Sequence, residues 1–124
     1  MRTMEPTSKV TDKHLEKCFQ VMKKIRFLDW EIPAQTIATL FYIASHEGCT
    51  KYELEEALGC SPASGSRNTD WLSKRHRLNK PGLDLITKEV DQRDPKKRRL
   101  ILKLSPKGRA FIKEIKSTLY ENQT

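Results

Sequence analysis

Hydrophobic residues recur at three- and four-residue steps in two stretches, one towards each end of the chain. The apolar stripes are Leu15, Cys18, Phe19, Met22, Ile25 and Leu28 in the first stretch, and Phe111, Ile112, Ile115 and Leu119 in the second. This period predicts amphipathic helices, one from Thr11 as N-cap to about Asp29, and one from Ser105 as N-cap, with Pro106 at its first position, to about Tyr120. Each stripe needs a covering surface, which is either the rest of this domain or a second copy.

Three shorter helices are predicted between these two. One begins at Ile32-Pro33 and runs to about His46, with Gly48 placed to stop it and an inner face of Ile37, Leu40, Phe41 and Ala44. Thr50 caps the next, with Glu53 as its capping-box partner, and Gly59 ends it. Ser61-Pro62 starts the third at once, which runs to about His76. Two short helices joined by a tight turn containing glycine predict a helix-turn-helix.

The helix that begins at Ser61 has an unusual composition for a core element. Its first two turns, residues 63–69, read ASGSRNT, and only Trp71 and Leu72 offer apolar anchors. Such an end can press closely into a DNA major groove, where its amides and hydroxyls meet phosphate and Arg67 and Asn68 read base edges. The alternative is a poorly packed, exposed helix with no partner.

A β-hairpin with a cationic tip is predicted before the last helix. Leu85–Val90 and Leu100–Leu104 are short runs rich in Ile, Leu and Val, separated by a polar loop that contains Asp91, Asp94 and Pro95. The tip also carries Arg93, Lys96, Lys97, Arg98 and Arg99. A donor-rich arm of this kind suits a negatively charged partner.

The charge distribution supports an anionic partner. The 124 residues carry a net charge of +8, and residues 61–104 hold 12 basic against 5 acidic side chains, a net +7. Lys74, Arg75 and Arg77 belong to this segment, although cations near a helix C-terminus are also favoured by the helix dipole. A solvated surface without a partner is the alternative, but it does not require one segment to hold nearly all the excess.

Other classes of function find little support in the sequence. We find no nucleophile with its base, no paired carboxylates and no phosphate-binding glycine loop, so we expect no enzyme activity and no cofactor. Three cysteines in no metal spacing predict a reduced, cytoplasmic protein without a metal site. Cys18 lies in an apolar stripe, where a buried, inert thiol is expected. No apolar run approaches the length of a membrane span.

The order of elements, together with two motifs, resembles the MarR family of bacterial regulators over roughly residues 30–115. TKYELEEALGCSPASGSRNTDWL is similar to the family's helix-turn-helix, with Leu54, Leu58, Gly59 and Leu72 at its core and turn positions. The DQRD of Asp91–Asp94 and the LKLSPKGR of Leu102–Arg109 are similar to its wing. The resemblance implies that Arg93 enters the minor groove, held by a salt bridge from Asp91, and that the first and last helices form a homodimer.

We therefore expect a mainly α fold with a small β-hairpin wing, a winged helix-turn-helix flanked by dimerisation helices. Residues 1–10 would form a flexible leader and 11–124 one domain, in which 11–31 and 105–121 dimerise and 32–104 bind DNA. The expected DNA-binding residues are Ser61, Ser64, Ser66, Arg67, Asn68, Lys74, Arg75, Arg77, Asp91, Arg93, Lys96, Lys97 and Arg98.

The expected function is a sequence-specific regulator of transcription, a repressor that binds an inverted repeat in double-stranded DNA as a homodimer. The alternative is a winged-helix module for replication or protein interaction without operator specificity. A small-molecule effector stays open, with no residue that supports it.

Overall fold

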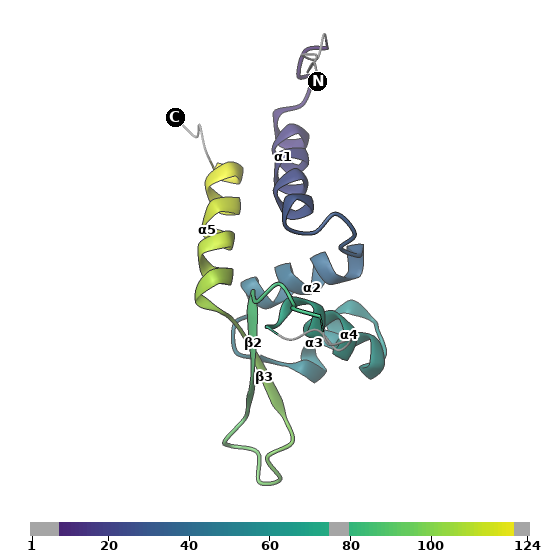
Figure 1. Cartoon of the computed structure of the whole chain (residues 1–124), viewed down its shortest axis with the longest axis vertical. Helices are drawn as coiled ribbons and strands as arrows, with labels where there is room; N and C mark the ends of the chain where they lie inside the picture. Colours follow the sequence, from purple (N-terminus) through teal and green to yellow (C-terminus); the bar gives the residue numbers. More distant parts are fainter. Residues whose placement is uncertain (1–7, 75–79, 121–124) are drawn as a thin grey trace.

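The computed structural model describes residues 8–74 and 80–120 and shows five helices with one small sheet (Figure 1). The helices are α1 (Lys13–Leu28), α2 (Ala34–Ser45), α3 (Lys51–Leu58), α4 (Pro62–Leu72) and α5 (Pro106–Tyr120), and the strands are β1 (Cys49–Thr50), β2 (Ile86–Val90) and β3 (Leu100–Leu104). The predicted fold class, mainly helical with a β-hairpin between the helix-turn-helix and the last helix, is confirmed.

Local capping signals set most helix starts. The Thr50 side chain accepts the Glu53 amide while the Glu53 carboxylate accepts the Thr50 amide, which is the predicted capping box of α3. Gly59 ends α3 in the left-handed region, with φ 65°. The prediction for α1 was wrong by one residue, because Asp12 rather than Thr11 accepts the first free amides, at 2.9 and 3.0 Å. A carboxylate also suits the positive end of the helix dipole.

The end of α4 differs from the prediction. The helix stops at Leu72, whereas the sequence predicted that it would continue to about His76, a residue outside the described part. Backbone bonds from the returning chain take over the last carbonyls: the Leu85 amide donates to Leu72 at 2.7 Å and the Leu83 amide to Trp71 at 3.1 Å. Tertiary pairing therefore ends the helix before its sequence composition would.

The sheet has three antiparallel strands in the order β1-β3-β2. β2 and β3 form the predicted hairpin, with Ile86 opposite Leu104 and Val90 opposite Leu100. β1 was not predicted, because two residues leave no periodic signal; Cys49 lies opposite Leu102 and closes one edge of β3. Near the helices, β3 is therefore paired on both sides, with β1 and β2. Beyond β1 the wing continues as a two-stranded hairpin.

The core lies between the helix-turn-helix and the base of the sheet. Leu40, Ile43, Leu54, Leu72 and Leu102, contributed by α2, α3, α4 and β3, are each fully buried. The predicted inner face of α2 was partly wrong. Phe41 is 37% exposed, and Ile43 points inward instead. This core holds α4 rigidly at the base of the wing.

Helices α1 and α5 lie side by side at the end of the molecule opposite the wing (Figure 1). They bury Ile25 and Ile115 against the core. The outer part of the α1 stripe is uncovered, however, with Leu15 66% and Phe19 56% exposed. Cys18 is exposed as well, so the expected buried thiol is wrong for the single chain. No helix in residues 8–74 and 80–120 is long and apolar enough to cross a membrane.

Candidate nucleic-acid interface

The first turn of α4 carries a chain of hydroxyl groups that ends on an arginine. The Ser61 hydroxyl accepts the Ser64 amide at 3.1 Å, and the two serine hydroxyls lie 3.2 Å apart. Arg67 donates from Nη2 to the Ser64 hydroxyl at 2.8 Å, and its side chain is exposed. Because these contacts restrict an otherwise mobile side chain, the guanidinium is held over the N-terminal turn, where free amides and the helix dipole favour an anion.

Asn68 does not belong to this exposed surface, and the expectation that it faces a groove is wrong. Its side chain is 5% exposed. The Thr36 hydroxyl donates to Asn68 Oδ1 at 2.8 Å, and Asn68 Nδ2 donates to Gln35 Oε1 at 2.9 Å. Asn68 therefore fastens α4 to the first turn of α2. No pattern in the sequence signals this role, because an Asn beside an Arg on a polar helix is equally typical of a base contact.

Helices α3 and α4 lie close together at Gly65. A Cβ added at Gly65 would lie 2.3 Å from Glu55 Oε2, so the glycine allows α4 to approach α3. Lys51 pairs with Glu55 and also donates to the Pro62 carbonyl at 3.1 Å. Sequence reasoning missed Lys51, which ties α3 to the start of α4. Ser66, another predicted contact, is half-buried on α4.

The wing turn is organised around a buried carboxylate. Asp91 is 1% exposed; its Oδ1 accepts the Arg93 amide at 3.0 Å and Arg93 Nε at 3.2 Å, and its Oδ2 lies 3.6 Å from Arg99 Nη1. The salt bridge implied between Asp91 and Arg93 is confirmed as a contact. The hydrogen bonds from the Arg93 backbone and side chain, and the positive charges of Arg93 and Arg99, hold the pKa of Asp91 below its ordinary value.

Asp94 shapes the tip of the wing. Its carboxylate accepts the backbone amides of Arg99, Arg98 and Lys96 at 2.8, 2.9 and 3.2 Å. These backbone bonds hold the pKa of Asp94 below its ordinary value. An aspartate that gathers three amides makes the tip a fixed turn, so its cations are presented from a defined backbone.

The basic side chains of the wing tip differ in whether they bond to the turn itself. Lys97 adopts a left-handed φ of 53°, and its Nζ donates to the Gln92 carbonyl at 3.2 Å and to Gln92 Oε1 at 2.7 Å. Lys96 and Arg98 are exposed. Lys97 therefore braces the turn, whereas Lys96 and Arg98 are the side chains best placed to reach outward.

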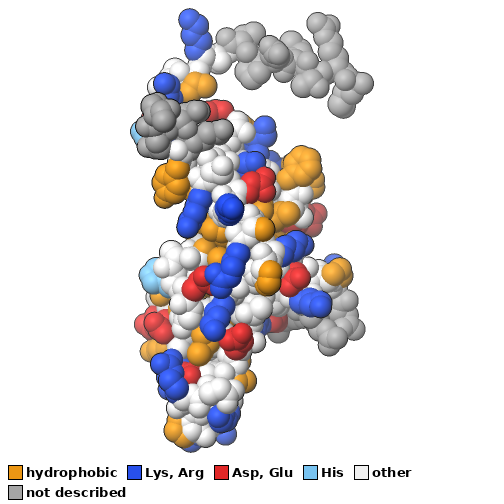
Figure 2. Space-filling model, turned by 90° about the vertical axis from the view of Figure 1, so that its left-hand side faces the viewer, with side chains coloured by type: hydrophobic (Ala, Val, Ile, Leu, Met, Phe, Trp, Pro, Cys, Tyr) orange, Lys and Arg blue, Asp and Glu red, His pale blue; other side chains and the backbone are white. Residues whose placement is uncertain are grey.

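The remaining predicted residues follow α4. Lys74 is exposed just beyond the helix end. Arg75 and Arg77 lie outside the described residues. Figure 1 shows the hairpin projecting from the end of the molecule opposite the termini, with α3 and α4 beside its base. Figure 2 shows Lys and Arg side chains at this lower end of the molecule.

No protein-family model and no curated protein sequence matches the chain. Among solved structures, MepR of Staphylococcus aureus, determined in complex with DNA, matches with a TM-score of 0.67 at 23% identity, over 86% of this chain and 79% of that one. A MarR transcriptional regulator of Methanosarcina mazei matches with a TM-score of 0.62 at 16% identity, over 88% and 70%. The chain has the fold of the MarR regulators.

A further structure supports the same MarR fold. RV1404 of Mycobacterium tuberculosis matches with a TM-score of 0.59 at 18% identity, over 94% of this chain and 78% of that one. Each of these matches covers more than four fifths of the chain. The likeness establishes the architecture, and the chemistry of the surface must be argued from this chain's own side chains.

Proposed function

We propose that the protein is a sequence-specific, double-stranded DNA-binding regulator of transcription that acts as a homodimeric repressor on an inverted repeat. The observation that carries the proposal is a pair of arginines, each held by its own neighbour. Arg67 is held by Ser64 on α4, and Arg93 is held by Asp91 on the wing. Of the structural neighbours, MepR is described in complex with DNA.

In the proposed complex α4 is the recognition helix. Its N-terminal turn meets the major groove, where the Ser61 and Ser64 hydroxyls contact phosphate and Arg67 bonds to O6 and N7 of a guanine. Asn68 takes no part in base reading, since its amide is engaged with Thr36 and Gln35. Direct readout from α4 therefore depends chiefly on Arg67.

The wing supplies the second contact. Arg93 is 82% exposed although its Nε is bonded to buried Asp91, so its guanidinium can insert into a minor groove without losing its anchor. Lys96 and Arg98 then lie against the flanking phosphates, where they add affinity without sequence information. The ordered backbone at Asp94 lowers the entropic cost of ordering the tip on DNA.

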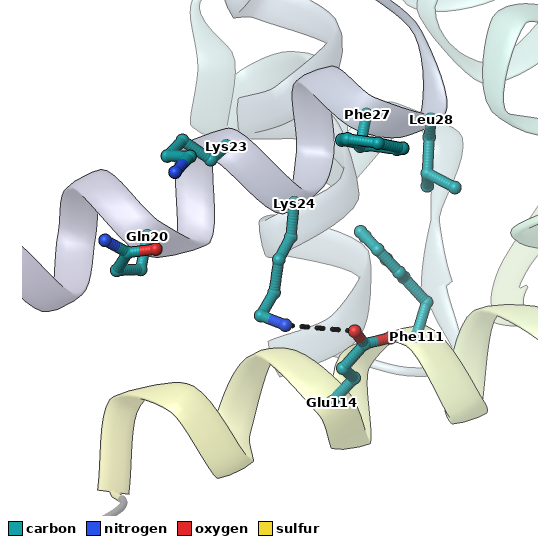
Figure 3. Close-up of a pocket in the computed structure, with 7 residues that line it drawn as sticks. All are labelled: Gln20, Lys23, Lys24, Phe27, Leu28, Phe111 and Glu114. Carbon is teal, nitrogen blue, oxygen red and sulfur yellow. Dashed lines mark hydrogen bonds and ion pairs between the residues drawn. The ribbon is translucent and has the colours of Figure 1, made fainter. Parts of the chain in front are cut away.

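The proposed dimer uses the uncovered face of α1. Leu15 and Phe19 are more than half exposed, an arrangement typical of a surface that a partner covers. A groove of about 380 Å³ lies between α1 and α5, with the Phe27 and Phe111 rings at one end and the Lys24–Glu114 ion pair of 3.0 Å across it (Figure 3). A second copy related by a two-fold axis would place its α4 against the second half-site of an inverted repeat.

Two variants separate base reading from general attraction. The duplex that the wild-type protein selects from a random-sequence pool serves as probe, and a scrambled duplex as reference. Arg67→Ala should reduce the preference for the selected duplex by about 10- to 100-fold, the loss of one bidentate base contact. Replacing Lys96 and Arg98 together by Ala should weaken both duplexes equally and reduce the salt slope by about 2.

The matched control is Lys13→Ala, an exposed lysine at the start of α1, distant from the wing. It should leave the preference and the salt slope unchanged. If Arg67→Ala weakens both duplexes to the same extent, the protein reads no sequence through α4, and the module without operator specificity is the correct function.

A further inference from the structure

Within residues 8–74 and 80–120, a charged pair joins the wing to the recognition helix, in addition to the backbone contacts between them. Lys88, in the middle of β2, forms an ion pair with Asp70, in the last turn of α4. The two side chains are 22% and 24% exposed, so the pair is largely shielded from solvent. Neither residue belongs to the surface that the proposed function assigns to DNA.

Asp70 occupies a position that ordinarily disfavours a carboxylate. The C-terminal turn of a helix carries the negative end of its dipole, and α4 has no basic residue in its last turn. Lys88 supplies the compensating charge from another element. The ion pair therefore stabilises an acidic residue at this point for as long as the strand that carries Lys88 lies against the helix.

Other contacts near the pair hold the base of the wing. The amides of Leu83 and Leu85 donate to the carbonyls of Trp71 and Leu72, so the chain is pinned to the end of α4 just before β2 begins. β1 holds the β3 side of the hairpin at Leu102 and Ile101, so a tilt of the wing would move its outer strand, β2, relative to α4. Lys88 is three residues along β2 from Leu85, and its contact with α4 limits this tilt on the β2 side.

The length of the wing makes the tilt important. Leu85 and Asp91 are six residues apart, about 20 Å of extended strand, so a tilt of about 10° moves the wing turn by about 3.5 Å. A displacement of that size exceeds the range of a hydrogen bond. Arg93, which is anchored on Asp91, would then miss the minor groove while α4 occupies the major groove.

We infer that the Asp70–Lys88 ion pair sets the angle between the wing and the recognition helix, so that Arg93 and Arg67 reach their two grooves at the same time. The inference rests on the proposed function and adds two positioning residues to it. Both act through the placement of Arg93 and neither touches DNA.

Asp70→Asn tests the inference, because the two explanations predict opposite changes in DNA affinity. The change removes a negative charge close to the DNA-binding surface, so electrostatics alone predicts tighter binding. Positioning predicts the opposite: about fivefold or greater loss of affinity for the duplex that the wild-type protein selects, and no more than the loss caused by Arg93→Ala. Lys88→Arg keeps the ion pair and should bind within about twofold of the wild type.

A double-mutant cycle with Arg93→Ala distinguishes positioning from loss of stability. In the Arg93→Ala background the wing contact is already gone, so adding Asp70→Asn should change affinity by less than about twofold. A variant that merely destabilises the fold would show the same loss in both backgrounds. Lys88→Gln removes the pair from the other side and should give the same non-additive result if Asp70→Asn does not fold.

Binding of Asp70→Asn as tight as the wild type, or an equal loss with and without Arg93, would overturn the inference and leave the proposed function standing. A wild-type protein that shows no preference for any duplex over a scrambled one would overturn both.

Discussion

Replacing Asn68 by Ala is expected to destabilise the protein, although the residue lies on the recognition helix. The change removes two hydrogen bonds, from Thr36 Oγ1 at 2.8 Å and to Gln35 Oε1 at 2.9 Å. Each contributes about 1 kcal/mol, and the Thr36 hydroxyl, which is 0% exposed, loses its acceptor at a further cost of about 1–2 kcal/mol. The free energy of unfolding should fall by about 3–4 kcal/mol in total.

Urea unfolding followed by circular dichroism measures this loss. All variants are compared at one protein concentration, because self-association would raise the apparent stability. The double variant Thr36→Val/Asn68→Leu replaces both partners by apolar groups and should recover to within about 1 kcal/mol of the wild type. Arg67→Ala, an exposed neighbour on the same helix, is the control and should change stability by less than about 0.5 kcal/mol.

An Asn68→Ala variant that unfolds like the wild type and yet loses preference for the selected duplex would rule out the structural role of Asn68. That result would mean that Asn68 turns outward and reads a base, as its place in the sequence predicted.

Three further predictions concern acid stability, thiol reactivity and self-association. The pKa values of Asp91 and Asp94 are lowered in the folded chain. Their contribution to stability is therefore complete above the unfolded pKa, about 4, and is lost as the pH falls through the folded pKa values. In unfolding measurements between about pH 2 and 6, the free energy of unfolding of Asp94→Asn should fall less steeply with acid than that of the wild type. An equal slope in both proteins would show that the Asp94 bonds are absent in solution. Burial, with the negative charge of nearby Glu53, raises the pKa of the Cys49 thiol to about 11. Peptide-resolved alkylation at pH 8 should therefore label Cys49 about 100-fold more slowly than exposed Cys18. Equal labelling rates would contradict the burial of Cys49. Phe19→Glu should shift sedimentation towards the monomer, and an unchanged sedimentation coefficient over a range of concentrations would place the dimer contact elsewhere.

The elements of the fold were predictable because their boundaries are set by neighbours in sequence. The capping box of Thr50 and Glu53, the left-handed Gly59 and the Ser105 cap of α5 each depend on residues two to four positions apart. The same holds for the wing turn, where Asp91 and Arg93 are two residues apart. Local contacts of this kind leave a readable pattern.

The features that sequence reasoning missed depend on residues that are distant along the chain. Asn68 is buried because Thr36, 32 residues away, meets it. The end of α4 is set by backbone bonds from residues 82–85. The Asp70–Lys88 pair spans 18 residues and two kinds of element. A single sequence carries no signal for such pairs, so the candidate site could be placed on the right elements before its individual side chains could be assigned.

A competition measurement at about 150 mM salt, near physiological ionic strength, tests most directly whether α4 and the wing bind one double helix together. The wild-type protein is bound to the duplex that it selects from a random pool, and a scrambled duplex of equal length and composition competes for it. If Arg67 and Arg93 contact one double helix together, the selected duplex should be preferred by about 10³-fold or more. Equal affinities for the two duplexes would contradict the account.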